Sequence, residues 1–279
     1  MNRVQQGIAT GFLLLGALFA APAQAAPVLY GVTGAGGAPS SLYTVDPLTG
    51  AATLIGATGF SHVTGIDFDP TTGTLYGVVS DLFNGTTALI TIDPATGAGT
   101  VVGTTGNQIP DITIGPDGIL RGWSECSAVP CSAADPDNPI AIDKGTGAVT
   151  LTSSSLSTQD TGVASRTATT IFVKPIGDLY SVDVNTGVAT FLFGTNLSLQ
   201  NLLENAPDGT LLTGARSPDG TQFYSIDVAT QTATPLGASK VLFSGIAYTP
   251  VVSIPEPGTL ALLGLCLGLV GLALRRPAR

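Results

Sequence analysis

Asp67 and Glu204 are the two side chains whose types and spacing could carry out acid–base chemistry together. They occupy the same position in two similar stretches, GIDFDPTTGTLYGV (65–78) and NLLENAPDGTLLTGA (201–215). If the stretches are copies of one structural unit, both carboxyls point into one central channel. There they could act as general acid and base or hold a cation. The alternative is a pair of solvated polar residues in a wet channel, so we assign no catalytic residue.

The sequence contains few of the residues that other common catalytic and metal sites require. His62 is the only histidine, which excludes a zinc site built from several histidines, and no GxSxG motif accompanies it. We expect His62 to be an exposed loop residue. The cysteines form no CxxC pair, and no cofactor is predicted. Cys126 and Cys131 lie in the insertion ECSAVPCSAADPDNP, where an exported protein would form a local disulfide, the alternative being two free thiols. The insertion is also a candidate recognition loop.

The elements that must position these residues follow from a repeated hairpin. The stretch ITIDPATGAGTVVG (90–103) has a β-branched run, a turn of Asp, Thr and Gly, and a second apolar run. It recurs as YTVDPLTGAATLIG (43–56), IAIDKGTGAVTLTS (140–153), YSVDVNTGVATFLFG (180–194) and YSIDVATQTATPLG (224–237). Because every copy has the turn, we interpret it as scaffold, with weak Ca²⁺ binding as the alternative. Gln231 replaces glycine in the last copy, so that turn should be strained or differently shaped.

The hairpins alternate with a second two-strand pattern, which gives four strands per unit. The aspartates of the five hairpin turns are 47, 50, 40 and 44 residues apart, the period of a β-propeller blade. The last strand, GIAYTP (245–250), and the first, VLYGVTG (28–34), each match part of one unit. We therefore predict that residues 26–251 form an all-β, five-bladed propeller of four-stranded antiparallel blades, closed by the N- and C-terminal strands. The rivals are a six-bladed ring with a degenerate blade and a β-sandwich.

The charge of the body limits its partners. Between residues 26 and 254 there are 18 acidic and six basic residues, a net charge of −12. Such a surface repels phosphate groups, so we predict no nucleic-acid binding.

The N-terminal 25 residues have the pattern of a secretory signal peptide. Arg3 precedes an apolar run, expected to be helical, and Ala23 and Ala25 form a small-x-small cleavage site. We expect export by the Sec machinery with cleavage after Ala25. The alternative is a retained membrane anchor.

Residues 252–279 have the composition of a membrane-targeting tail. Residues 258–274 are uncharged and predict a short transmembrane helix, about 25 Å long at 1.5 Å per residue. The flanking residues are Pro255, Glu256 and Pro257 before it, and a basic end at 275–279 that includes Arg275 and Arg276. This combination resembles the PEP-CTERM sorting signal. The resemblance implies recognition and tail removal by exosortase in a Gram-negative bacterium. It also implies transient inner-membrane anchoring, then delivery to the cell surface or exopolysaccharide matrix. A plain membrane anchor is the alternative.

These observations favour an exported cell-surface or matrix protein that binds exopolysaccharide or other surface proteins without catalysis. The alternative is an extracellular glycan hydrolase using Asp67 and Glu204, which would need carboxyls about 5–9.5 Å apart beside a sugar-sized groove. A third possibility is a lattice or adhesin role through Ca²⁺.

Overall fold

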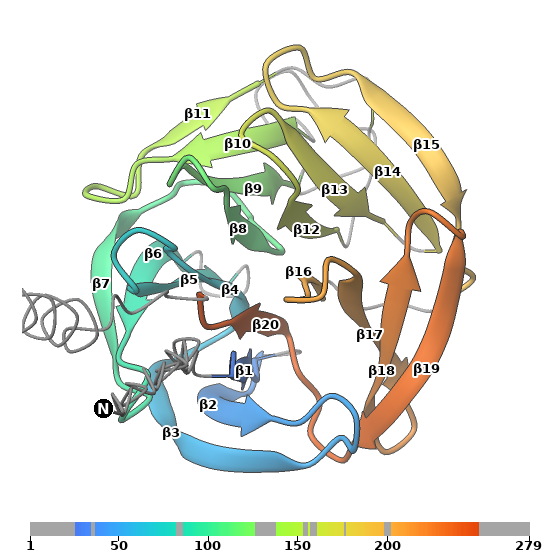
Figure 1. Cartoon of the computed structure of the whole chain (residues 1–279). Coiled ribbons are helices and arrows are strands. Elements are labelled where there is room, and N and C mark those ends of the chain that lie inside the picture. Colours follow the sequence, from blue (N-terminus) through green and yellow to red (C-terminus); the bar gives the residue numbers. More distant parts are fainter. Residues whose placement is uncertain are drawn as a thin grey trace, which may run out of the picture. The chain divides into compact units, whose positions relative to one another are not determined.

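The computed structural model describes residues 26–34, 37–81, 86–125, 138–152, 156, 161–175, 177–197 and 202–250. The strands in this part of the chain form five sheets, each of four antiparallel strands. Residues 26–251 make one compact unit in which the sheets are arranged as a wheel around a common centre (Figure 1). The five-bladed propeller predicted from the repeats is confirmed, and the six-bladed ring and the sandwich are excluded.

Each blade runs from an innermost to an outermost strand. Blade 1 contains β20 (Gly245–Tyr248), β1 (Leu29–Val32), β2 (Pro39–Val45) and β3 (Ala52–Ser61). Blade 2 contains β4 (Val63–Phe68), β5 (Leu75–Asp81), β6 (Thr86–Ile92) and β7 (Gly99–Thr104). Blade 3 contains β8 (Ile112–Ile114), β9 (Leu120–Ser124), β10 (Asn138–Ile142) and β11 (Val149–Leu151). Blade 4 contains β12 (Gly162–Ser165), β13 (Thr170–Lys174), β14 (Asp178–Asp183) and β15 (Ala189–Gly194). Blade 5 contains β16 (Leu203–Asn205), β17 (Leu211–Ser217), β18 (Gly220–Asp227) and β19 (Thr232–Ser239).

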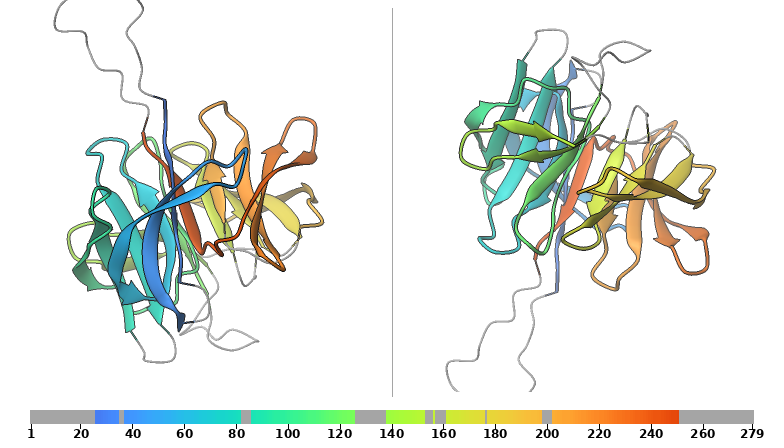
Figure 2. Two further views of the ribbon diagram at one scale, coloured as in Figure 1. Left: turned by 90° about the horizontal axis from the view of Figure 1, so that it is seen from below. Right: turned by 90° about the horizontal axis from the view of Figure 1, so that it is seen from above.

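Blade 1 closes the wheel because it takes its inner strand from the end of the body. β1 pairs with β20 in antiparallel register, from Leu29 opposite Tyr248 to Val32 opposite Gly245. The backbone N–H of Thr249 donates to the carbonyl oxygen of Val28 at 2.9 Å. Figure 2 shows the beginning of β1 and the end of β20 at the same face of the wheel. The split repeat is therefore one four-stranded sheet, in which β20 pairs with the edge of β1 that faces the centre of the wheel.

The repeated turns owe their shape to the side chain of their aspartate. In blade 1 the carboxylate of Asp46 accepts hydrogen bonds from the N–H of Leu48 at 2.9 Å and the hydroxyl of Thr49 at 2.7 Å. Equivalent bonds to the backbone form at Asp93, Asp143, Asp183 and Asp227. The residue that ends the turn has a positive φ, 76° at Gly50 and 57° at Gln231. The last turn therefore keeps its shape and places a non-glycine residue in the left-handed region.

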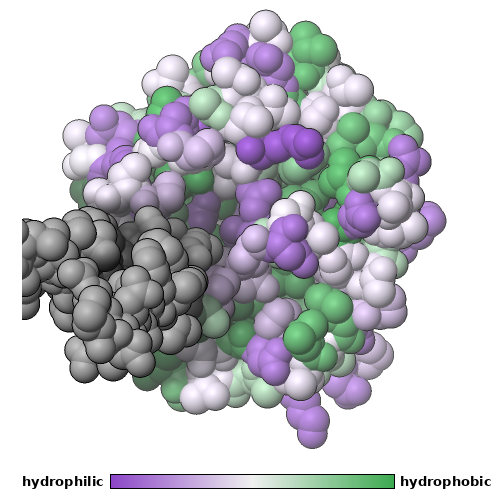
Figure 3. Space-filling view, in the orientation of Figure 1, coloured by the Kyte–Doolittle hydropathy of each residue, from purple (hydrophilic) through white to green (hydrophobic). Residues whose placement is uncertain are grey.

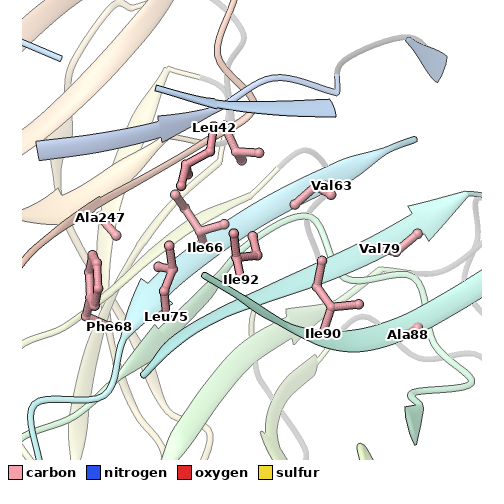
Figure 4. Packing of buried hydrophobic residues seen from close by; sticks show 11 residues of the cluster. Leu42, Val63, Ile66, Phe68, Leu75, Val79, Ala88, Ile90, Ile92 and Ala247 are labelled. Carbon is pink, nitrogen blue, oxygen red and sulfur yellow. The ribbon is translucent and has the colours of Figure 1, made fainter. Parts of the chain in front are cut away.

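The core lies between neighbouring blades. One apolar cluster joins Leu42 and Ala247 of blade 1 to residues of blade 2 that include Ile66, Leu75 and Ile90 (Figure 4). All five of these side chains are buried. Each blade is a thin sheet with apolar residues on both faces, so blades gain stability by packing on one another.

A second contact between blades uses glycine on both sides. A Cβ atom at Gly56, on outer strand β3, would overlap the carbonyl oxygen of Thr96 in the turn of blade 2. A Cβ atom at Gly97 in that turn would lie 2.7 Å from the carbonyl oxygen of Gly56. Between blades 4 and 5 the equivalent residues are Phe193 and Gln231, as the strand registers show. The turn of one blade therefore contacts the outer strand of the preceding blade most closely where glycine occupies both positions, the one in the turn and the one in the strand.

The signal peptide (1–25) and the tail helix (258–274) lie outside the described residues. Within the described ranges there is no helix long and apolar enough to cross a membrane.

Candidate functional site

The aligned position that raised the possibility of chemistry lies on the inner strands. Asp67 is on β4, Thr113 on β8, Ala164 on β12 and Glu204 on β16, with Ala247 on β20. These five strands are the innermost of their blades (Figure 1). The structure thus brings Asp67 and Glu204 to the centre of the wheel, as the alignment predicted. They are not solvated there, since only 6% of Asp67 and 8% of Glu204 is exposed.

The carboxylate of Asp67 is held by backbone groups of two blades. One oxygen accepts a hydrogen bond from the N–H of Phe68 at 2.7 Å. The other accepts one from the N–H of Ile114, on the inner strand of the next blade. Burial raises the pKa of Asp67 to about 7, even though these two N–H groups and the hydroxyl of Thr113 favour the ionised form. The negative charge of Asp69 raises this pKa further.

A third central carboxyl, Asp111, is absent from the sequence prediction. Its oxygens accept hydrogen bonds from the N–H groups of Ile112 and Val163, both at 3.0 Å. Burial raises its pKa well above the ordinary value, against the effect of the N–H groups of Val163, Ile112 and Leu203, and the charge of Asp67 adds to the rise. Leu203 lies on β16, so this one side chain connects the inner strands of blades 3, 4 and 5.

The sequence does contain a signal for Asp111. At this level of the inner strands three blades have glycine, namely Gly65, Gly162 and Gly245. A Cβ atom at Gly65 would lie 2.5 Å from a carboxylate oxygen of Asp111, so this side chain fills the space that the missing side chain leaves. An aspartate where other copies have glycine therefore marks a residue that reaches across the centre.

Glu204 completes a group of three interacting carboxyls. Burial raises its pKa well above the ordinary value, followed by the negative charges of Asp67 and Asp111, while the N–H of Asn205 favours the ionised form. The group therefore retains protons at pH values where exposed carboxyls have lost them. It titrates as a coupled set rather than as one acid and one base with separate roles.

The chemistry open to this group is limited by its contacts. Asp67 and Asp111 use both oxygens to bind backbone N–H groups, and a hydrolase pair needs a groove that admits a sugar. The described residues contain no group of three His, Cys, Asp or Glu side chains arranged to hold a metal ion. In the space-filling view, hydrophilic residues lie at the centre of the face, surrounded by mixed hydrophilic and hydrophobic ones (Figure 3). This arrangement of buried carboxyls is typical of a structural contact that links the inner strands of neighbouring blades.

Other buried polar side chains make similar contacts between blades. The hydroxyl of Thr113 accepts a hydrogen bond from the N–H of Ser165 at 2.8 Å. This bond joins blades 3 and 4, as the bond from Ile114 to Asp67 joins blades 2 and 3. At the turns, Lys144 of blade 3 forms an ion pair with buried Asp69 of blade 2 at 2.5 Å. Arg121 donates to the carbonyl oxygen of Ala168 in blade 4 at 2.8 Å. Lys144 and Arg121 thus each join two neighbouring blades.

The prediction for His62 is wrong. This residue immediately precedes β4, is 7% exposed and has a φ of 57°. A Cβ atom at Gly37 would lie 2.6 Å from its Nε2 atom, so the loop before β2 covers the imidazole. Sequence reasoning treated a single polar residue between repeats as a surface residue, whereas the loop of the neighbouring blade buries it.

The remaining predicted site residues lie outside the described residues. They are the cysteine pair Cys126 and Cys131, the cleavage residues Ala23 and Ala25, and the sorting residues Pro255, Glu256, Pro257, Arg275 and Arg276. The cysteine insertion connects β9 to β10. The disulfide and the signal cleavage stay predictions.

Comparison with protein families identifies the tail. Residues 253–276 match the family described as the PEP-CTERM protein-sorting motif. This chain carries a PEP-CTERM motif. The match confirms the resemblance drawn from the Pro-Glu-Pro tripeptide, the uncharged span and the basic end. A PEP-CTERM motif implies an exported protein that resides transiently in the membrane and is sorted by exosortase.

Comparisons of the whole chain concern the fold. No curated protein matches the sequence significantly. A chain of a nidogen/laminin complex is similar in structure, with a TM-score of 0.52 and 10% identity over 80% of this chain and 98% of that one. TolB from Acinetobacter baumannii has a TM-score of 0.47 and 18% identity, covering 76% of this chain and 52% of TolB. The chain thus spans about half the length of that TolB. The nidogen/laminin similarity supports a propeller fold and carries no function.

Proposed function

We propose that this chain is a surface or matrix protein of a Gram-negative bacterium. Its PEP-CTERM tail directs exosortase processing, and its propeller acts by binding other matrix components, such as exopolysaccharide or surface proteins. The observation that carries the proposal is the match of residues 253–276 to the sorting motif directly after a closed propeller. After tail removal the propeller would keep all its strand pairings, because β20 ends at Tyr248.

A binding role without catalysis is supported by the central carboxyls. Asp67 and Asp111 are buried, and each accepts a hydrogen bond from an N–H group of the next blade, which favours a role in holding the inner strands together. To test this, the purified protein is incubated with a panel of oligosaccharides beside Asp67→Asn and Glu204→Gln variants. We expect no cleavage by any of the three. Cleavage by the unaltered protein that either substitution abolishes would establish the hydrolase instead.

The sorting step is tested by intact mass and cell fractionation. In a host with exosortase we expect a mature protein shortened near Pro255 and located outside the inner membrane. A strain without exosortase should retain the tail and hold the protein in the inner membrane. Replacing Pro255 and Pro257 by alanine should have the same effect as removing the enzyme. Pro277→Ala is the matched control, since it lies just beyond the matched segment.

An unchanged mass and an inner-membrane location in both strains would overturn the sorting proposal.

A further inference from the structure

A pocket of about 550 Å³ lies between blades 5 and 1. Its apolar lining includes Leu212 on β17 and Leu236 on β19. The turn of blade 1 that contains Asp46 and the inner turn of blade 5 that contains Asp208 contribute to its lining, as does Tyr248 at the end of β20. Its volume is in the range of pockets that bind small organic molecules.

The pocket lies at a blade boundary that lacks the ion pair found between blades 2 and 3. Between blades 2 and 3 the same two kinds of turn are joined by the ion pair of Lys144 and Asp69. In the repeat alignment, Pro47 occupies the position of Lys144 and Ala206 that of Asp69. Neither residue has a charge, so these two positions form no ion pair between blades 5 and 1. Both residues line the pocket instead.

The acidic groups of the pocket are ionised at neutral pH. The pKa of Asp46 is lowered by the hydroxyl of Thr49 and the N–H of Leu48, and that of Asp208 by the hydroxyl and N–H of Thr210. Burial raises the pKa of the Tyr248 phenol to about 12, and the charges of Glu204, Asp208 and Asp46 add to the rise. The phenol therefore stays neutral, and the negative charges of Asp46 and Asp208 both act on it.

None of the residues that line the pocket is a lysine, arginine or histidine. The two carboxylates therefore have no compensating cation within the lining, which also contains the apolar residues Leu212 and Leu236. A ligand that complements both features has an apolar body and one positive charge.

We propose that this pocket binds a small organic cation, an alkyl or aryl ammonium compound whose apolar body lies against Leu212 and Leu236 and whose charge faces Asp46 and Asp208. The proposal deepens the binding role given above and rests on it. It names the chemical class of a ligand that the propeller would recognise. Neutral compounds would lose the attraction of the carboxylates, and anionic ones would be repelled.

The test is calorimetric titration of the full chain in non-ionic detergent with six small probes. Three are cations: hexylammonium, 2-phenylethylammonium and benzyltrimethylammonium. The others are hexanol, 2-phenylethanol and 3-phenylpropanoate, which match the apolar bodies without the positive charge. For probes of this size we expect saturable binding of at least one cation with a dissociation constant on the order of 1 mM. The matching alcohol should bind about fivefold more weakly, and the carboxylate should show no saturation.

Variants show whether the binding is in the pocket. Asp46→Asn and Asp208→Asn should each weaken cation binding by about fivefold. Ala206→Leu should abolish cation binding by filling the cavity. Any heat that remains with this variant reports partition of the probes into the detergent micelles. Asp93→Asn is the matched control for Asp46→Asn, because Asp93 makes the same turn hydrogen bonds outside the pocket. Unfolding curves show which variants keep the fold.

The proposal is overturned if none of the three cations saturates, or if the alcohols bind as tightly as the cations. It is also overturned if Ala206→Leu abolishes binding while both asparagine variants leave it unchanged, since the cavity would then have no preference for charge. These results concern the pocket alone. Localisation in the exosortase-deficient strain decides the sorting proposal separately, so failure of one is distinguishable from failure of the other.

Discussion

The buried central carboxyls predict that the propeller loses stability as the pH rises from 5 to 7. The pKa of Asp67 is about 7 in the folded protein, against 3.8 for an exposed aspartate. A carboxyl whose pKa is raised on folding stabilises the protein fully below its unfolded pKa. It loses that contribution as pH rises through the folded value, because the folded state binds more protons.

The size of the effect follows from the same two values. Between pH 5 and pH 7, one such carboxyl lowers the free energy of unfolding by about 2 kcal/mol. Asp111 and Glu204 act in the same direction. The exposed turn aspartates have lowered pKa values, so their contribution is lost only in more acidic solution. The pKa of Lys174 is lowered to about 8, so this lysine adds stability only as pH rises above that value. The window from pH 5 to 7 therefore reports the central carboxyls.

The assay is urea unfolding at pH 5, 6 and 7, followed by circular dichroism. A loss of about 2 kcal/mol corresponds to a midpoint lower by about 1 M urea. Glu204→Gln should flatten the decline, while Asp208→Asn, at an exposed turn, should leave it unchanged. The scan is repeated on His62→Asn as a control for the single histidine, because asparagine tolerates the positive φ of this position. A midpoint that stays constant or rises from pH 5 to 7 would refute the argument that these carboxyls are protonated because they are buried.

Three further predictions concern the contacts between blades. Gln231→Gly should raise the melting temperature by about 2–4 °C, because it removes roughly 1 kcal/mol of left-handed strain, measured by thermal unfolding. The reciprocal change Gly97→Gln should lower it by a larger amount, since the new side chain would also meet the backbone of Gly56; equal and opposite shifts would contradict the docking of turns on outer strands. Lys144→Met should cost about 1–3 kcal/mol in urea unfolding by leaving buried Asp69 without its cation, a loss that high salt should not reproduce. Stability unchanged in the Lys144 variant would show that the ion pair contributes nothing net.

The fold could be predicted largely because the sequence repeats. Five copies of one hairpin, each with an Asp-opened turn, fix the strand number, and the split copy at the two ends fixes the closure. The burial of side chains at the centre of the wheel could not be predicted in the same way. Alignment brought Asp67 and Glu204 together correctly, but their burial depends on how closely the inner strands approach. That approach depends on glycines such as Gly65 and Gly245, whose effect appears only when the blades are assembled.

His62 and Asp111 are two further residues whose burial or contacts the repeats do not predict. Each is a polar residue that the other repeats lack at that position, and its surroundings come from a different part of the chain. A loop before β2 covers His62, and N–H groups of β12 and β16 hold Asp111.

The sequence by itself determined the strand order, the turn chemistry and the sorting motif, because each of these is written in residues close together along the chain. Only the tertiary structure decided which side chains are buried at the centre and where a pocket lies. Both depend on contacts between blades, where residues more than a hundred positions apart, such as Asp46 and Asp208, line one pocket.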